Sequence, residues 1–140
     1  MGTQKELMLR NGQLWRISTD PGPPPGKDRW GACVLASVTD MSFSDADLAA
    51  RAAVEGRCPA IAVIGPNAEA VHDYIDEIVE SKGASDVLTT FNSGANGLEE
   101  ALSMLDAGLS GRGPIYAFSN PPSFVENGLR NMGFIAGEKP

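Results

Sequence analysis

The chain is poor in the residues that most often carry chemistry. Its 140 residues include one histidine and two cysteines, which are too few for a four-ligand zinc site without carboxylates. It contains no G-x-x-x-x-G-K-[ST], no G-x-G-x-x-G and no G-x-S-x-G motif. A P-loop, a dinucleotide-binding fingerprint and a nucleophile elbow are therefore excluded.

Positive charge is scarce as well. Lys and Arg together number 11 and Asp and Glu number 18, so the formal net charge is −7. An acidic chain is not captured electrostatically by nucleic acid or by an anionic membrane surface. We therefore expect neither as a partner, whereas a basic protein would match the charge.

Long hydrophobic runs are absent too. No apolar run approaches the roughly 18 to 20 residues that a membrane span needs, and residues 1–10 lack the apolar stretch of a secretory signal. Cys33 and Cys58 lie at or beside expected buried strands, and we interpret them as reduced core thiols. A disulfide or a reactive thiol is the alternative. These features favour a cytoplasmic protein.

The composition that remains is globular, with 42% hydrophobic and 21% charged residues. The length predicts one α/β domain over residues 1–140, with an N-terminal segment over 1–12 and a Pro/Gly-rich loop over 19–29. Four prolines and two glycines within residues 19–26 exclude a helix or a central strand there. We interpret this loop as a stiff linker, with a Pro-rich recognition motif as the alternative.

Strands and helices are expected to alternate along the rest of the chain. The expected strands are 13–18, 30–38, 59–65, 86–91 and 114–119, and the expected helices are 45–55, 68–82, 98–107 and 121–132. Ser44 is expected to be the N-cap of the first helix. The unbroken apolar run over 30–38 is typical of a strand covered on both faces. No helix separates the strand over 13–18 from the next one, so we expect it to lie antiparallel at an edge.

This alternation predicts parallel strands joined by right-handed crossovers. The expected fold is an α/β three-layer sandwich whose sheet of four to five strands is mostly parallel and doubly wound, as in flavodoxin-like proteins. The four principal strands are expected in the order 2-1-3-4. Seven strand residues are expected to be nearly inaccessible to solvent: Val34, Leu35, Val63, Ile64, Leu88, Ile115 and Ala117.

Ligands of such sheets bind beyond the carboxyl ends of the strands. The polar residues that follow the expected strands are the candidate ligand-binding residues: Asp40, Asn67, Asn92, Asn96 and Asn120. Because no Lys, Arg, His or Cys lies at these ends, we assign no catalytic residue, no metal site and no cofactor. The turn over 65–67 offers a helix start without a cation, so we interpret it as a capped turn rather than an anion site.

Two families of flavodoxin-like shape were compared with these strand ends. Response-regulator receivers need an acid pair, a phospho-accepting Asp and a later Lys, whereas Asp40 stands alone and no Lys follows Ser119. Flavodoxins need a Ser/Thr/Gly-rich phosphate loop, which residues 37–41 do not form. The chain therefore resembles both families only in its expected topology, and topology alone does not determine function.

His72 is the single histidine, and Asp73 and Asp76 follow it closely. The functional interpretation is a base oriented by a carboxylate, or half of a metal site. The alternative is a half-exposed histidine on an acidic helix. We favour the alternative, because His72 lies about 7.5 Å along the helix from its start and away from the strand ends.

The stretches His-Asp-Tyr-Ile-Asp-Glu over 72–77 and Val-Leu-Thr-Thr-Phe over 87–91 resemble a pattern in small, acidic, uncharacterised bacterial proteins. The resemblance covers about 20 of the 140 residues. Some such proteins act as immunity or accessory proteins, so the resemblance implies a role of that kind. It supplies no site residues.

Two functions remain open. The first is a binding or regulatory protein without chemistry of its own, which the acidic charge and the missing catalytic motifs favour. The second is a small enzyme or nucleotide-responsive domain, in which Asp40 acts as a base and Asn67, Thr90 and Asn92 orient a small-molecule ligand.

Overall fold

The computed structural model describes residues 4–10, 12–19, 29–84, 86–94, 96–105 and 113–135. The described strands are β1 (Gln4–Met8), β2 (Leu14–Ser18), β3 (Ala32–Ser37), β4 (Ala60–Ile64), β5 (Leu88–Asn92) and β6 (Ile115–Asn120). The described helices are α1 (Phe43–Glu55), α2 (Ala68–Ser81), α3 (Gly97–Met104) and α4 (Pro122–Asn131). Most of the expected Pro/Gly-rich loop, residues 20–28, lies outside the described residues.

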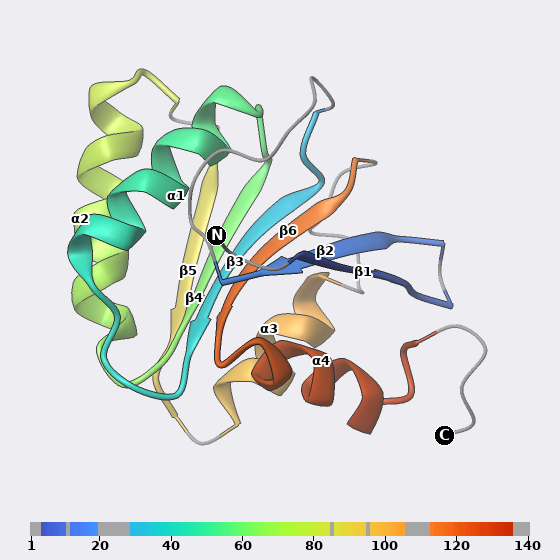
Figure 1. The fold of residues 1–140 in the computed structure, drawn as a ribbon. Coiled ribbons are helices and arrows are strands. Elements are labelled where there is room, and N and C mark those ends of the chain that lie inside the picture. Colours follow the sequence, from blue (N-terminus) through green and yellow to red (C-terminus); the bar gives the residue numbers. More distant parts are fainter. Residues whose placement is uncertain are drawn as a thin grey trace.

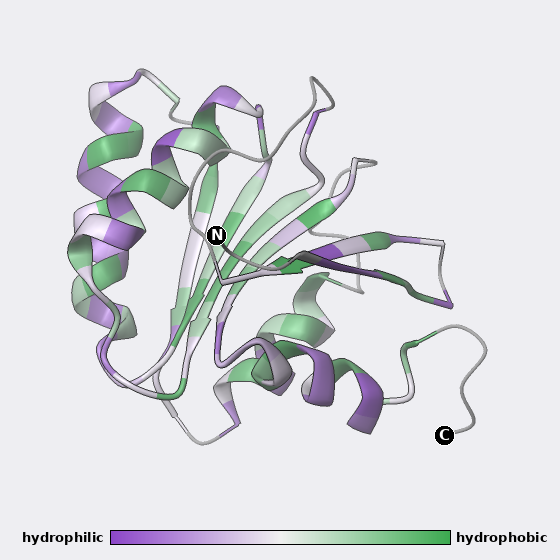
Figure 2. Ribbon diagram, viewed as in Figure 1, coloured by the Kyte–Doolittle hydropathy of each residue, from purple (hydrophilic) through white to green (hydrophobic). Residues whose placement is uncertain are grey.

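The elements form three layers, as predicted. Helices α1 and α2 cover one face of the sheet, and α3 and α4 cover the other (Figure 1). Figure 2 shows the central strands mostly hydrophobic and the helices mixed, as expected for strands that are covered on both faces. Within the described residues, no helix combines the length and the apolar character needed to cross a membrane.

The sheet has six strands in the order β1-β2-β6-β3-β4-β5. The predicted order 2-1-3-4 is wrong, because the four principal strands follow the order 3-2-1-4. Right-handed crossovers on one face all step in the same direction along a sheet. Helices α1 and α2 share a face, so β3, β4 and β5 follow one another, whereas α3 on the other face returns the chain to β6 beside β3.

The N-terminal strands also differ from the expectation. Strand β2 is an interior strand that pairs in parallel with β6, with Trp15 opposite Ile115, so the expected antiparallel edge position is wrong. The edge belongs to β1, which pairs antiparallel with β2 and lies in the segment 1–12 where no element was expected. Trp15 and Ile17 are buried, and such apolar side chains need neighbours on both sides of their strand.

Each face of the sheet has its own hydrophobic core. Of the seven residues expected to be inaccessible, six are confirmed as buried: Val34, Leu35, Val63, Ile64, Ile115 and Ala117. Leu88 is the exception, with 46% of its surface exposed. It lies on β5, the edge strand beyond β4, where none of the described residues adds a further strand.

The start of α1 is set by a different serine from the one expected. The sequence favours Ser44 as the N-cap, but the Ser42 hydroxyl accepts the hydrogen bond from the Asp45 backbone N–H at 3.2 Å. The helix therefore begins at Phe43 and presents buried alanines to the sheet: Ala46, Ala49, Ala50 and Ala53.

Candidate functional site

A crevice of about 180 Å³ opens where β3 and β6 end. The arrowheads of the parallel strands in Figure 1 mark this edge of the sheet. Its lining comes from the ends of β2, β3 and β6 and from the loop that leads into α1: Thr19, Leu35, Ala36, Ser37, Asp40, Met41, Ser42, Asp45, Phe118, Ser119 and Asn120.

The strand order explains why the crevice forms here. The chain leaves β3 toward α1 on one face, and it leaves β6 toward α4 on the other. The two connections diverge and leave a gap between neighbouring strands. This is the topological switch point, where doubly wound sheets bind their ligands.

Two buried serines form the floor of the crevice. Ser119 is 1% exposed, and its hydroxyl donates to the Pro121 carbonyl at 2.6 Å and accepts from the Val125 backbone N–H at 3.2 Å. The Ser37 hydroxyl accepts from the Thr39 backbone N–H at 3.2 Å. These bonds hold the loops after β6 and β3, so the two serines shape the crevice.

The charge of the lining is negative. Asp40 and Asp45 are its two charged residues, and the lining residues that the structure describes include no lysine, arginine or histidine. The adjoining N-terminus of α1 already carries the Ser42 cap and the Asp45 carboxylate. An anion would therefore meet repulsion here, whereas a cation or a hydroxyl-rich group would meet acceptors.

The structure brings together two of the five predicted site residues. Asp40 and Asn120 line the crevice. Asn67 follows β4 but does not line it, because its side chain is bonded to the backbone of Met41. Its Nδ2 donates to the Met41 carbonyl at 3.0 Å, and its Oδ1 accepts from the Met41 N–H at 2.9 Å. Asn67 therefore positions the loop that carries Asp40.

Asn92 and Asn96 lie elsewhere. Asn92 ends β5, and the order β6-β3-β4-β5 places it three strand spacings from Asn120, which is about 14 Å. Asn96 precedes α3, and its side chain does not cap that helix. A single small ligand cannot contact these residues and Asn120 together.

The sequence reasoning missed Ser37, Asp45 and Ser119 as site residues. Ser37 and Ser119 were detectable as the polar residues near the ends of two apolar runs. Asp45 entered the sequence analysis only as the first residue of the helix expected over 45–55. Its place in the lining follows from the position of that helix start next to β3.

The two cysteines are not among the residues that line the crevice. Cys33 and Cys58 are free and buried, so the disulfide alternative is wrong. Burial raises the pKa of the Cys58 thiol to about 12, and burial raises the pKa of the Cys33 thiol well above its usual value. Thiols held in the neutral form are poor nucleophiles.

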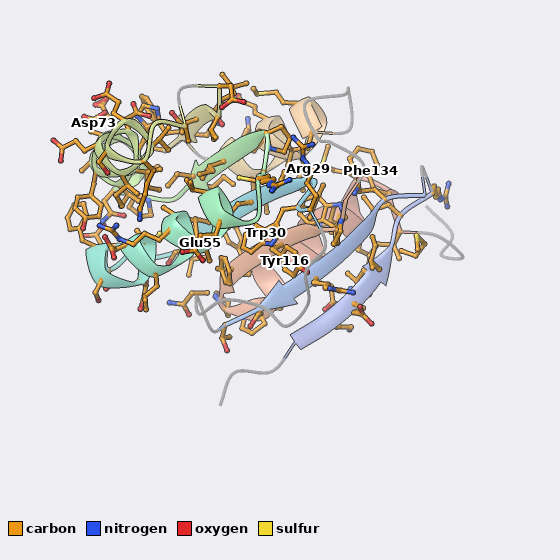
Figure 3. All side chains as sticks on the ribbon, turned by 90° about the horizontal axis from the view of Figure 1, so that it is seen from above. Arg29, Trp30, Glu55, Asp73, Tyr116 and Phe134 are labelled. Carbon is orange, nitrogen blue, oxygen red and sulfur yellow. The ribbon has the colours of Figure 1, made fainter. Side chains whose placement is uncertain are left out.

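His72 also lies apart from the crevice. It is on α2, against β5, and 15% of its side chain is exposed, less than the half-exposure expected. Figure 3 shows its neighbour Asp73 on the outer side of α2, well away from Trp30 and Tyr116. The position off the strand ends agrees with the sequence interpretation.

Comparison with known proteins finds no family model, no curated protein and no solved structure that matches the chain. The resemblance of residues 72–91 to small acidic bacterial proteins stays a prediction, because these comparisons do not test it. The residues that line the crevice are therefore the guide to its ligand.

Proposed function

We propose that the chain is a binding or regulatory protein without chemistry of its own, which takes a positively charged group into the crevice between β3 and β6. The observation that carries this proposal is the pair of carboxylates, Asp40 and Asp45, in a lining that otherwise offers hydroxyl and amide groups. An amine or a guanidinium is the chemistry that such a lining recognises.

The size of the crevice further limits the range of possible ligands. About 180 Å³ is less than the roughly 300 to 1,000 Å³ of pockets for drug-sized ligands. The crevice suits one cationic head group with a short stem. The phosphates of a nucleotide would meet the carboxylates of Asp40 and Asp45, and the described lining residues offer no cation to bind them.

Two sources can supply such a head group. One is a free small molecule, and the other is a Lys or Arg side chain of a basic protein. The net charge of −7 would speed the approach of either, and added salt would slow it. The two sources differ in contact area, because a basic protein also touches the surface around the crevice.

The test is a titration followed by amide NMR. Ethylguanidinium and butylamine are expected to shift the amide resonances of Ser37, Asp45 and Asn120, and inorganic phosphate is not. A lysine- and arginine-rich peptide should bind at least tenfold more tightly than ethylguanidinium if a basic protein is the natural source. Equal affinities would identify a small molecule instead.

Variants assign the binding to the crevice. Asp40→Asn and Asp45→Asn should each weaken ethylguanidinium binding by roughly 1.5- to fivefold, which corresponds to the free energy of one exposed charge pair. Asp86→Asn removes the same charge outside the crevice, and Asn92→Ala alters a strand end that does not line it, so both are controls. The proposal is wrong if the two crevice variants bind as the wild type does, or if phosphate binds more tightly than the cations.

A further inference from the structure

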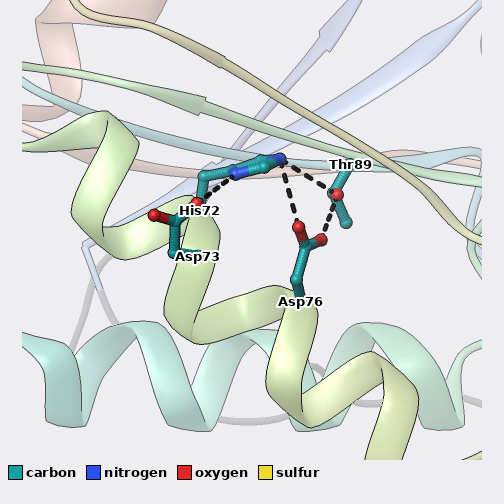
Figure 4. Close-up of polar contacts among 4 residues, drawn as sticks. All are labelled: His72, Asp73, Asp76 and Thr89. Carbon is teal, nitrogen blue, oxygen red and sulfur yellow. Dashed lines mark hydrogen bonds and ion pairs between the residues drawn. The ribbon is translucent and has the colours of Figure 1, made fainter.

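A second polar cluster lies outside the crevice lining, where α2 packs against β5. Figure 4 shows its four members, His72, Asp73 and Asp76 on α2 and Thr89 on β5. One ligand atom from each of His72, Asp73 and Asp76 lies within 4.8 Å of the others. The crevice proposal uses none of these residues.

The histidine ring is held in place from two sides. Its Nδ1 lies 3.1 Å from a carboxylate oxygen of Asp73, and its ring centre lies 4.8 Å from that of Phe91. A carboxylate that accepts one ring N–H leaves the other ring nitrogen with a free lone pair. This is the usual arrangement around a metal-binding histidine.

The second ring nitrogen faces acceptors. His72 Nε2 lies 3.6 Å from Asp76 Oδ2 and 3.2 Å from the Thr89 hydroxyl oxygen, while that hydroxyl donates its one hydrogen to Asp76 Oδ1. When Nδ1 carries the ring proton, the Nε2 lone pair and the Asp76 carboxylate face each other with no hydrogen between them. A cation placed there turns this repulsion into attraction.

The spacing also fits a metal ion. Zinc binds histidine nitrogen at about 2.0 to 2.1 Å and carboxylate oxygen at about 2.0 to 2.2 Å in tetrahedral geometry, which sets the two ligand atoms about 3.4 Å apart. The observed separation between Nε2 and Asp76 Oδ2 is 3.6 Å. The one-turn spacing of His72 and Asp76 on α2 therefore needs an adjustment of only about 0.2 Å.

We propose that His72 Nε2 and the Asp76 carboxylate bind one divalent transition-metal ion, with the Thr89 hydroxyl oxygen as a third, neutral ligand and water in the remaining position. Asp73 orients the ring and does not touch the metal. An imidazole with a carboxylate favours zinc and its first-row neighbours over magnesium or calcium, which prefer oxygen alone.

The single histidine makes the test direct. Tag-free, ¹⁵N-labelled protein is titrated with zinc chloride in a non-coordinating buffer, and the imidazole nitrogens are observed by NMR. Because His72 is the only histidine, each ring signal is assigned without ambiguity. One equivalent of zinc should shift the Nε2 signal strongly and leave Nδ1 protonated, and calorimetry should give one zinc per chain.

Four variants separate coordination from general negative charge. His72→Gln should abolish this binding, Asp76→Asn should weaken it at least tenfold, and Thr89→Val should weaken it less. Glu77→Gln is the matched control, because it removes one charge from the next, exposed position of α2 and should change the affinity less than twofold.

Three results would overturn the proposal. The first is a wild-type Nε2 signal that does not respond to zinc at millimolar concentration. The second is an Asp76→Asn variant with unchanged affinity, and the third is a Glu77→Gln variant that loses as much affinity as Asp76→Asn. The NMR readout uses the unaltered protein, so the test stands even if a variant fails to fold.

Discussion

Adding one methyl group at Gly56 should damage the core beneath α1. A Cβ built at Gly56 would lie 2.4 Å from two atoms of the Trp30 indole, Cδ1 and Nε1, whereas carbon atoms normally pack at about 3.5 to 4.0 Å. The indole would have to move by roughly 1 Å. Trp30 is 5% exposed, and its ring packs against the tilted ring of Tyr116 with the centroids 4.3 Å apart, so the movement disturbs a second ring.

The size of the effect follows from two opposing terms. Replacing Gly by Ala stabilises a protein by about 0.4 to 1 kcal/mol through the unfolded chain, and the backbone of Gly56, at a φ of −77°, accepts Ala without strain. Overpacking a core destabilises it by about 1 to 3 kcal/mol. The expected net loss for Gly56→Ala is about 1 to 2 kcal/mol, or roughly 3 to 6 °C in Tm for a chain of this length.

Thermal and urea unfolding followed by circular dichroism measure this loss. The control is Gly94→Ala, where a Cβ meets no atom within 4 Å and φ is not positive, so its stability should stay equal or rise slightly. If Gly56→Ala is as stable as Gly94→Ala, then Trp30 does not pack against the end of α1 as described.

Two further predictions concern the cores. Val63→Asp buries a carboxylate at a fully enclosed position and should cost several kcal/mol, so soluble expression should fail, whereas Leu88→Asp on the exposed edge should express normally. Native Cys58 and Cys33 should react slowly with a thiol reagent at pH 8, because burial raises their pKa values, and both should react fully after unfolding. Fast native labelling would contradict their burial.

The layers of the fold could be predicted from the sequence, but the strand order could not. Alternating strands and helices require right-handed crossovers, and this rule does not say in which direction each crossover steps. The direction depends on which helices share a face. Helices α1 and α2 share a hydrophobic core, and the Tyr74 hydroxyl of α2 donates to Asp47 of α1 at 2.9 Å. Such contacts join segments that are distant in the sequence, so no local pattern reveals them.

Two further errors in the strand predictions, the missed β1 and the expected burial of Leu88 on β5, also arise from interactions that local sequence patterns do not show. Strand β1 reads Gln-Lys-Glu-Leu-Met and lacks the apolar alternation that marks a half-buried strand, so only its pairing with β2 reveals it. The strand over 88–92 contains two threonines and an asparagine among five residues. That lower apolar content is typical of an edge strand, and the edge position leaves Leu88 exposed.

The candidate site could be predicted only in part, because its position depends on the strand order. The rule that ligands bind at the carboxyl ends of strands selects Asp40 and Asn120, and the structure places both in the lining of the crevice. It cannot exclude Asn67, Asn92 and Asn96, because every parallel strand ends at the same edge. Only the observed order shows that the switch point lies between β3 and β6.

The pairing of β2 with β6 has a consequence for the order of folding events. Arg16 Nη1 donates to the Tyr116 hydroxyl at 2.7 Å across a separation of 100 residues, and β6 is the strand that joins β2 to the rest of the sheet. During synthesis the β1–β2 hairpin therefore has no sheet to join until the ribosome has released β6. The unit from β3 to β5 closes over shorter loops and can assemble earlier. A ribosome that stalls before Ile115 leaves β3 with an open apolar edge, the kind of surface that chaperones bind and that other chains extend into aggregates.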